Sequence, residues 1–210
     1  ASRATPNDFQ THAVEIAMAN SRGTVNVLEY AKENSARVFI ASTSEVYGNP
    51  DVHPQTEGYN GNVNPTGPRA PYNESKRLAE GLAMTYARND GVDVRVGRIF
   101  NTYGPRMHPE DSRVIPSFVT QALNNQDLTV HGEGTQTRSF CYVTDLIDGI
   151  RRLMETKGLQ REVFNLGNPN EITILQLAEQ IQEIVSTESK MIHEPRPTDD
   201  PDIRKPDITK

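Results

Sequence analysis

The sequence has few of the features that cross-link an exported protein or anchor a membrane protein. Cys141 is the one cysteine among 210 residues, which excludes a disulfide within the chain and favours a reducing compartment. The sequence contains no signal-peptide pattern and no apolar run of membrane length. These absences predict a soluble, cytoplasmic protein with no membrane association.

Positive charge and tryptophan are also scarce. The net charge is -6 and tryptophan is absent, and no block of Lys and Arg offers a surface that follows a phosphate backbone. We therefore expect no nucleic-acid partner. The five histidines show no metal-ligand spacing and none pairs locally with Cys141, so neither a metal site nor a thiol nucleophile is expected.

Glycine is not concentrated in a turn that would hold the phosphates of a dinucleotide. Such a turn follows the first strand of the binding unit and offers its backbone amides to the pyrophosphate. Gly132-Glu133-Gly134 is the nearest cluster, but it lacks a third spaced glycine and precedes an expected strand. We interpret it as an ordinary turn.

Hydrophobic periodicity predicts helices and strands in alternation. Helices are expected at 12–33, 72–89, 114–123, 146–154 and 173–185, and strands at 37–42, 92–99, 128–130, 137–143 and 162–166. The stretches 48–70 and 101–111 are expected loops. Thr144 is a possible cap for the helix that follows it, with Asp145 as a partner for the helix dipole rather than a catalytic group.

Tyr72 and Lys76 stand four residues apart at the start of an expected helix, so both side chains lie on one helix face. A phenol with an ordinary pKa of about 10 is a poor base, but a nearby cation stabilises the phenolate and lowers that pKa. The spacing fits a catalytic base with its helper, and it also fits two groups on a solvated helix surface.

A second polar cluster follows the expected strand at 37–42. Thr43-Ser44-Glu45 comes directly after it, and the carboxyl ends of strands are where open α/β sheets hold ligands. The alternative is a turn in which the hydroxyls of Thr43 and Ser44 bind their own backbone.

Five motifs run nearly end to end along the chain. They are Thr43-Ser44-Glu45-Val46-Tyr47-Gly48, Asn64 to Arg69, Arg98 to Arg106, Gln136 to Phe140, and Asp200 to Ile208. Together they resemble the UDP-glucuronate decarboxylases, which are extended short-chain dehydrogenases of the NAD-dependent epimerase/dehydratase family. The resemblance implies an α/β fold: the back half of a Rossmann-like doubly wound parallel sheet, plus a small α+β substrate-binding lobe.

The resemblance also implies a division of the chain. Residues 1–106 would form a partial NAD-binding domain without its Gly-rich first βαβ unit. Residues 107–210 would form mainly the substrate-binding lobe, with some return to the sheet. We therefore expect an internal fragment of a longer enzyme, and a homodimer built through the helices near 12–33 and 72–89.

The implied activity is NAD-dependent decarboxylation of UDP-glucuronate to UDP-xylose through a 4-keto intermediate, with NAD recycled internally. Tyr72 would be the base for the sugar's 4-hydroxyl, and Lys76 would lower its pKa and hold the nicotinamide ribose. Thr43 would bond the same hydroxyl, and Ser44 and Glu45 would complete the catalytic cluster. Arg204 would meet the substrate carboxylate or donate a proton, a role that guanidinium chemistry suits.

Further roles follow from the same resemblance. Asn101 and Arg138 would hold the nucleotide diphosphate, Thr102 and Arg113 the cofactor, and His131 would lie by the uracil, although a tyrosine is common there. Read without the family, Arg138 is a surface salt-bridge residue and the Pro- and Asp-rich stretch 195–210 is a disordered tail.

Three other functions remain open. Sugar-nucleotide 4,6-dehydratases typically carry Asp where Ser44 stands, and 4-epimerases a small residue where Glu45 stands, so both activities are disfavoured. The third alternative is of a different class: an inactive, truncated remnant that serves as an interaction module.

Overall fold

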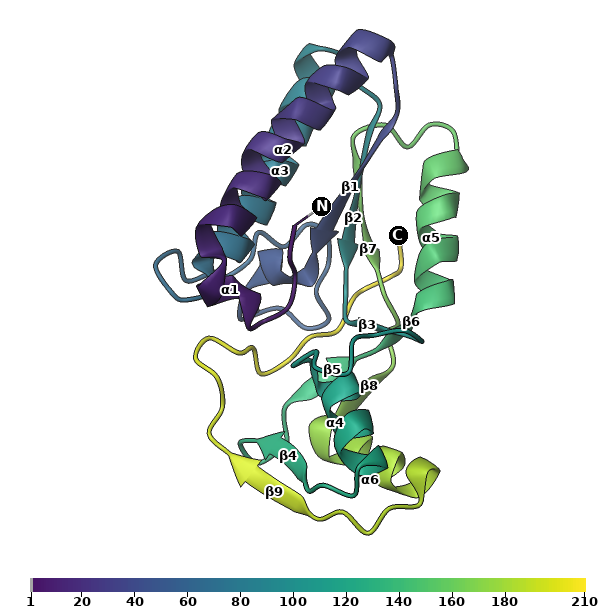
Figure 1. Cartoon of the computed structure of the whole chain (residues 1–210). Helices are drawn as coiled ribbons and strands as arrows, with labels where there is room; N and C mark the ends of the chain where they lie inside the picture. The colour runs from purple at the N-terminus through teal and green to yellow at the C-terminus, as the bar shows by residue number, and fades with distance from the viewer. Residues whose placement is uncertain (1) are drawn as a thin grey trace.

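The computed structural model describes residues 2–210, and one half of it is a three-layer arrangement of helices around a parallel sheet (Figure 1). The sheet has the order β1-β2-β7, and both neighbouring pairs are parallel. Its strands are β1 (Val38–Thr43), β2 (Val94–Ile99) and β7 (Glu162–Leu166). Helices α2 (Ala13–Asn34) and α3 (Ala70–Asn89) cover one face, and α5 (Val143–Glu155) covers the other.

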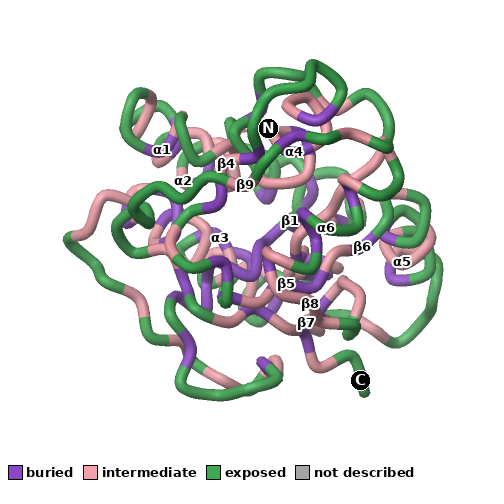
Figure 2. The backbone as a smooth tube through the Cα atoms, turned by 90° about the horizontal axis from the view of Figure 1, so that it is seen from below, coloured by how far each residue is buried: buried purple, intermediate pink, exposed green. Residues whose placement is uncertain are grey.

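The core of this half lies between the sheet and the α2–α3 pair. Buried valines and isoleucine on β1 and β2 meet small side chains on the helices, among them Ala83 and Ala87. Because these alanines are four residues apart, they lie on one face of α3. In Figure 2 the buried segments gather toward the middle of the molecule, and the exposed segments follow its outer loops.

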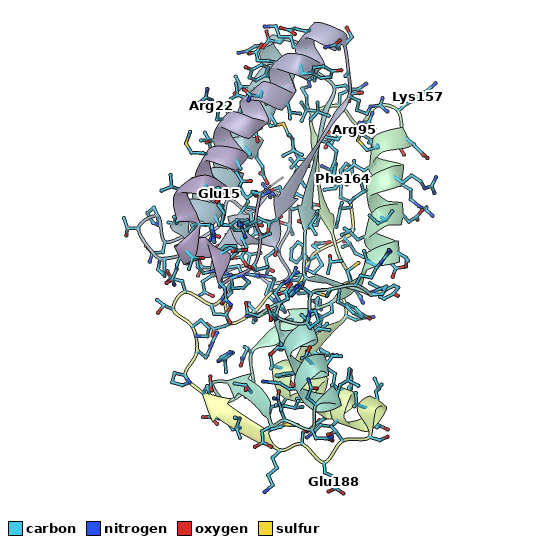
Figure 3. All side chains as sticks on the ribbon, viewed as in Figure 1. Glu15, Arg22, Arg95, Lys157, Phe164 and Glu188 are labelled. Carbon is cyan, nitrogen blue, oxygen red and sulfur yellow. The ribbon has the colours of Figure 1, made fainter. Side chains whose placement is uncertain are left out.

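On the face of the sheet covered by α5, Arg95 of β2 binds the end of that helix (Figure 3). This side chain of β2 is fully buried and donates hydrogen bonds to the carbonyls of Leu153, Met154 and Thr156 at the end of α5. A cation at a helix C-terminus is favourable because it meets the negative end of the helix dipole. Asp93 balances the charge at 3.2 Å from Arg95 Nε.

The second half is a smaller lobe of helices and two-stranded sheets. Its elements are α4 (Val114–Leu123), β4 (Leu128–His131), β5 (Thr137–Ser139), β8 (Glu171–Thr173), α6 (Ile174–Val185) and β9 (Met191–Glu194). β4 and β9 are parallel, whereas β5 and β8 are antiparallel. The short pair β3 (Thr102–Tyr103) and β6 (Cys141–Tyr142) lies between the halves. No helix within residues 2–210 is both long and apolar enough to cross a bilayer.

Most predicted elements are confirmed to within a few residues, and the Gly132–Gly134 turn is too, since both glycines have positive φ. Three predictions were wrong. The loop expected at 101–111 contains the short strand β3, because Thr102 and Tyr103 pair with β6. The strand expected at 137–143 is two strands, because β5 pairs inside the lobe while β6 pairs with β3. Thr144 does not cap a helix, because α5 already begins at Val143 and makes no side-chain cap bond.

The stretch 195–210, which composition alone describes as a disordered tail, is instead ordered by packing. It leaves β9, crosses from the lobe to the sheet and ends beside β7 (Figure 1). Ser139 donates a backbone hydrogen bond to Arg204, and Gln55 exchanges two with Lys205 and Asp207. Pro201, Arg204 and Pro206 are buried. We call residues 195–206 the strap.

Candidate active site

A cavity of about 690 Å³ lies between the sheet and the lobe, at the carboxyl ends of β1 and β2. All eleven residues singled out by the sequence line it. The residues predicted to be catalytic are Thr43, Ser44, Glu45, Tyr72, Lys76 and Arg204. The residues predicted to bind cofactor or substrate alone are Asn101, Thr102, Arg113, His131 and Arg138. We call this space the main cavity.

At the Thr43-Ser44-Glu45 cluster the backbone changes from a strand to a short 3₁₀ helix. Thr43 is the last residue of β1, and its hydroxyl accepts a hydrogen bond from the Glu45 amide at 3.2 Å, which caps the short 3₁₀ helix η1 (Ser44–Tyr47). The turn expected as an alternative is therefore present, and all three residues are buried at the cavity wall. Thr43 therefore makes the local capping bond and also lines the main cavity, so the two interpretations of this cluster are compatible.

Tyr72 lies in the first turn of α3, and its ring stacks on Phe9 with a centroid distance of 4.4 Å. Burial raises the pKa of Tyr72 to about 12; Thr43, Arg204 and Arg113 oppose this shift, and Glu45 reinforces it. The expected lowering of this pKa by Lys76 is not seen in the free chain. The Lys76 ammonium lies 5.8 Å from the Tyr72 ring centroid and donates to the Ala41 carbonyl at 2.8 Å.

Lys76 is itself affected by its surroundings. Burial lowers the pKa of its ammonium, because removal from water disfavours the charged form. The bond to Ala41 fixes the ammonium beside the end of β1, where it lines the main cavity with Tyr72. The helix spacing therefore does bring both groups to one site, with the Lys76 ammonium over the Tyr72 ring.

Glu45 is the electrostatic centre of the site. Its Oε1 accepts hydrogen bonds from Arg204 Nη1 at 2.6 Å and from Arg69 Nη2 at 2.7 Å. Burial alone would raise the pKa of Glu45, but the two guanidinium groups lower it below its ordinary value. Glu45 is therefore ionised at neutral pH. Its Oε2 and the Nη2 of Arg204 are buried and have no hydrogen-bond partner among residues 2–210.

Arg138 is neither a surface residue nor free of partners. It is buried, and it donates to the Asp200 carboxylate at 2.8 Å and to the Pro201 carbonyl at 2.8 Å. Burial lowers the pKa of Arg138 to about 10, with Asp200 opposing the shift. Its salt bridge with Asp200 thus holds the strap at the edge of the cavity. The interpretation of Arg138 as a surface salt-bridge residue, made without the family resemblance, was wrong about its burial.

Several of these residues have side chains of the kind that hold a nicotinamide ribose. Tyr72, Lys76 and Thr102 gather at the main cavity with a phenol, an ammonium and a hydroxyl, which suits the polar ribose next to a nicotinamide. Arg113 is held there by Asp111, whose carboxylate accepts from its Nε at 3.0 Å. The sequence holds no glycine-rich turn for the pyrophosphate, so these residues fit one half of the cofactor.

Three residues of the site were not singled out from the sequence. Arg69 binds Glu45 and lies 3.5 Å from Asp200, while Phe9 supports the Tyr72 ring. Arg69 carried a usable signal, because it ends the Asn64 to Arg69 motif and directly precedes the Tyr72 helix. Asp200 carried the same kind of signal, because it begins the Asp200 to Ile208 motif. Phe9 carried none, since it reaches the site only through the folding of distant segments.

The chain matches the model of the NAD dependent epimerase/dehydratase family over residues 1–167. It is 51% identical over 209 residues to UDP-glucuronic acid decarboxylase 5 of Arabidopsis thaliana, covering 99% of this chain and 60% of that protein. It is 49% identical over 210 residues to UDP-glucuronic acid decarboxylase 1 of Danio rerio, covering 100% of this chain and 50% of that protein. The chain thus spans about half to three fifths of these relatives' lengths.

Solved structures of similar fold include two sugar-nucleotide enzymes. The dTDP-glucose 4,6-dehydratase of Streptomyces venezuelae, solved with NAD bound, has a TM-score of 0.88 at 28% identity, covering 99% of this chain and 62% of that one. The UDP-glucuronic acid 4-epimerase of Bacillus cereus, solved with UDP-glucuronic acid and NAD, has a TM-score of 0.80 at 28% identity, covering 91% and 60%. These similarities confirm the predicted α/β fold class.

Proposed function

Because the chain belongs to the NAD dependent epimerase/dehydratase family, we propose that it forms the catalytic part of an enzyme that decarboxylates UDP-glucuronate to UDP-xylose. The observation that carries this proposal is the placement of Arg204. Although Arg204 lies 159 positions after Glu45 in sequence, it reaches the main cavity beside Tyr72. One of its buried nitrogens has no partner in the part of the chain that the structure describes. A guanidinium of this kind suits a substrate carboxylate.

Tyr72, Lys76, Thr102 and Arg113 would hold the nicotinamide half of NAD at the main cavity. When bound, NAD would oxidise carbon 4 of the sugar and later reduce it again, so that it is recycled and not consumed. Tyr72 would take the proton of the 4-hydroxyl, with Thr43 bonding the same group. Since the pKa of Tyr72 is about 12 in the free chain, bound ligands must favour the phenolate, and Lys76 is close enough to contribute.

The ketone at carbon 4 is β to the carboxylate on carbon 5, which is the arrangement from which carbon dioxide leaves readily. Arg204 would orient this carboxylate with its free Nη2, while Glu45 holds the other guanidinium nitrogen in place. The departing group leaves its electron pair on the sugar as an enolate. The cations around the cavity stabilise that negative charge electrostatically.

The lobe would bind the nucleotide. Asn101 and Arg138 would meet the diphosphate and His131 the uracil, all three at the main cavity. For Arg138 this requires that the diphosphate share it with Asp200, because both lie at one edge of the cavity. In this division, residues 1–106 serve the cofactor and residues 107–210 mainly the sugar nucleotide, with β7 returning to the sheet.

The product identifies the reaction, and this is our first prediction. The protein, and a version extended at its N-terminus by the matching segment of a curated relative, are incubated with NAD and UDP-glucuronate. We expect the extended version to form UDP-xylose with one carbon dioxide per sugar, measured by mass spectrometry and gas analysis. A 4-epimerised glucuronate would contradict decarboxylation, and a 4-keto-6-deoxy sugar formed in a parallel incubation with dTDP-glucose would indicate a dehydratase. If neither version binds NAD in calorimetry, the inactive interaction module is favoured.

We also propose a homodimer through α2 and α3. These helices expose large apolar side chains, namely Val14, Met18, Val27, Tyr30 and Leu78. Large apolar side chains exposed on two neighbouring helices favour a partner that covers them. A second copy, which brings the same two helices, would bury them by symmetry.

The second prediction tests this interface. Met18→Glu, at a side chain that is 50% exposed, is expected to shift the protein from dimer to monomer in sedimentation velocity, because the interface would have to bury a charge. Ile184→Glu is the matched control, since Ile184 is 81% exposed on α6, far from these helices. A monomer without substitution, or equal effects of both variants, would contradict the proposed interface.

A further inference from the structure

A row of polar side chains crosses the parallel sheet one residue before its strands end. Ser42 of β1 is the register partner of Arg98 of β2, and Arg98 is the partner of Asn165 of β7. Register partners in neighbouring strands lie side by side, so the three side chains share one face of the sheet. Arg98 also begins the Arg98 to Arg106 motif. The row lies next to the carboxyl ends of the strands, where the main cavity opens.

Arg98 makes charge-assisted hydrogen bonds to two other elements. Its Nε donates to Glu80 Oε1 at 3.0 Å and its Nη2 to Glu80 Oε2 at 2.8 Å, and both side chains are 13% exposed. Its Nη1 donates to the Tyr47 hydroxyl at 2.9 Å. Burial alone would lower the pKa of Arg98, but Glu80 raises it above its ordinary value, so the guanidinium is charged. The planar fork of an arginine is suited to making these contacts at once.

Glu80 ties the helix that carries Lys76 to the strand beside it. The two residues are four positions apart on α3, so they lie on one face of the helix. Lys76 donates to the Ala41 carbonyl at 2.8 Å, and Glu80 accepts from the Ser42 hydroxyl. Two successive residues of β1 are therefore bound to two successive turns of α3. These contacts fix how far the Lys76 ammonium lies along the strand.

Tyr47 extends the network to η1 and to the segment after the strap. It ends η1, two positions after Glu45, and its hydroxyl donates to Asn165 Oδ1 at 2.8 Å. Asn165 Nδ2 in turn donates to the Asp207 carbonyl at 3.0 Å, three positions after Arg204. The segments that carry Glu45 and Arg204 are therefore joined to the same network as α3.

Stability and ligand binding account poorly for this network. A buried ion pair commonly contributes no more than well-packed apolar side chains of similar size, because desolvation offsets the attraction. Neither Arg98 nor Glu80 lines the main cavity. We propose that Arg98 is a positioning residue, which sets the places of Lys76, Glu45 and Arg204 relative to one another through the segments that carry them. The proposal rests on the proposed decarboxylation, in which those three groups act on one sugar.

The positioning role can be tested without any measurement of activity. The double variant Glu80→Leu with Arg98→Met removes both charges together, so no buried charge is left unpaired. Its midpoint of urea unfolding is expected to be unchanged or raised, as is common when a buried ion pair is replaced by apolar side chains. In its crystal structure the Lys76 ammonium should have left the Ala41 carbonyl, to which it lies at 2.8 Å in the unsubstituted chain. An unmoved Lys76 in the folded double variant would overturn the proposal.

The consequence for catalysis is measured in the version that forms UDP-xylose. The double variant is expected to lower kcat by about ten- to a hundredfold, since a misplacement of about 1 Å can cost that much. The KM for UDP-glucuronate should change little, because Arg98 lies outside the main cavity. The rise of kcat/KM toward alkaline pH should move to higher pH, because a displaced Lys76 favours the Tyr72 phenolate less. A loss of stability alone would not move this pH profile.

Arg95→Met is the matched control, because Arg95 is a buried arginine of the same strand that binds the end of α5, away from the main cavity. It should lower the midpoint of urea unfolding and leave kcat and the pH profile unchanged. Arg98→Lys keeps the test decisive if the double variant does not fold: it retains the charge beside Glu80, loses the fork, and should lower kcat in the same way. Normal kcat in the folded Arg98 variants, or an equal fall in Arg95→Met, would overturn this inference alone. Absence of UDP-xylose from the unsubstituted version would instead refute the proposed function.

Discussion

Replacing Tyr72 with phenylalanine is expected to lower kcat by about 10²–10⁴-fold, the usual contribution of a positioned acid or base. The substitution removes the hydroxyl and keeps the ring that stacks on Phe9 at 4.4 Å, so the fold and the binding of UDP-glucuronate should change little. Steady-state kinetics with calorimetric measurement of substrate binding would separate the two effects. Tyr142→Phe is the matched control, because Tyr142 is outside the main cavity and 39% exposed.

The pH dependence gives an independent check on the same residue. A base must be deprotonated to act, and the pKa of Tyr72 is about 12 in the free chain. The value of kcat/KM, which reports the free enzyme, should therefore rise toward alkaline pH, and this rise should be lost in Tyr72→Phe. Near-normal turnover by the variant would refute the assignment of Tyr72 as the base.

Replacing Glu45 with alanine is expected to lower the free energy of unfolding by about 3–5 kcal/mol, as is usual when one partner of a buried ion pair is removed. The loss arises because Arg204, with a side chain 8% exposed, would keep its charge without a counter-ion, and Arg69, 13% exposed, would keep only the longer pair with Asp200 at 3.5 Å. Urea unfolding followed by circular dichroism measures the change. Asp202→Ala is the matched control: its pair with Arg196 is 65% and 33% exposed, and we expect a loss of about 1 kcal/mol or less.

The sign of the pH effect follows from the lowered pKa of Glu45. A carboxyl whose pKa is lower in the folded state contributes its full stabilisation above its ordinary value of 4.5 and loses it as the pH falls through the folded value. The difference in stability between the unsubstituted chain and Glu45→Gln should therefore narrow below about pH 4.5. A difference that stays constant down to strongly acidic pH would show that Glu45 does not carry this ionic stabilisation.

Local patterns were sufficient for most of the secondary structure. The helix predicted at 114–123 is α4 with the same bounds. The helix predicted at 173–185 is α6, which begins at Ile174, with Thr173 as its N-cap in a capping box with Gln176. The predictions of secondary structure failed where the division into strands depends on which distant strands pair with a segment. The segment 137–143 has strand character throughout, but whether it is one strand or two depends on β3 and β8, which come from other parts of the chain.

By itself, the sequence determined the order of the elements, the identity of the reactive side chains and the family, because periodicity, spacing and motifs are local properties of a chain. Only the tertiary structure decided what surrounds those side chains. It brought Arg69 and Arg204, 24 and 159 residues from Glu45, onto one carboxylate oxygen. It also buried Tyr72 so that its pKa is raised instead of lowered. Charge interactions and desolvation depend on distance in space, so a linear pattern does not specify them.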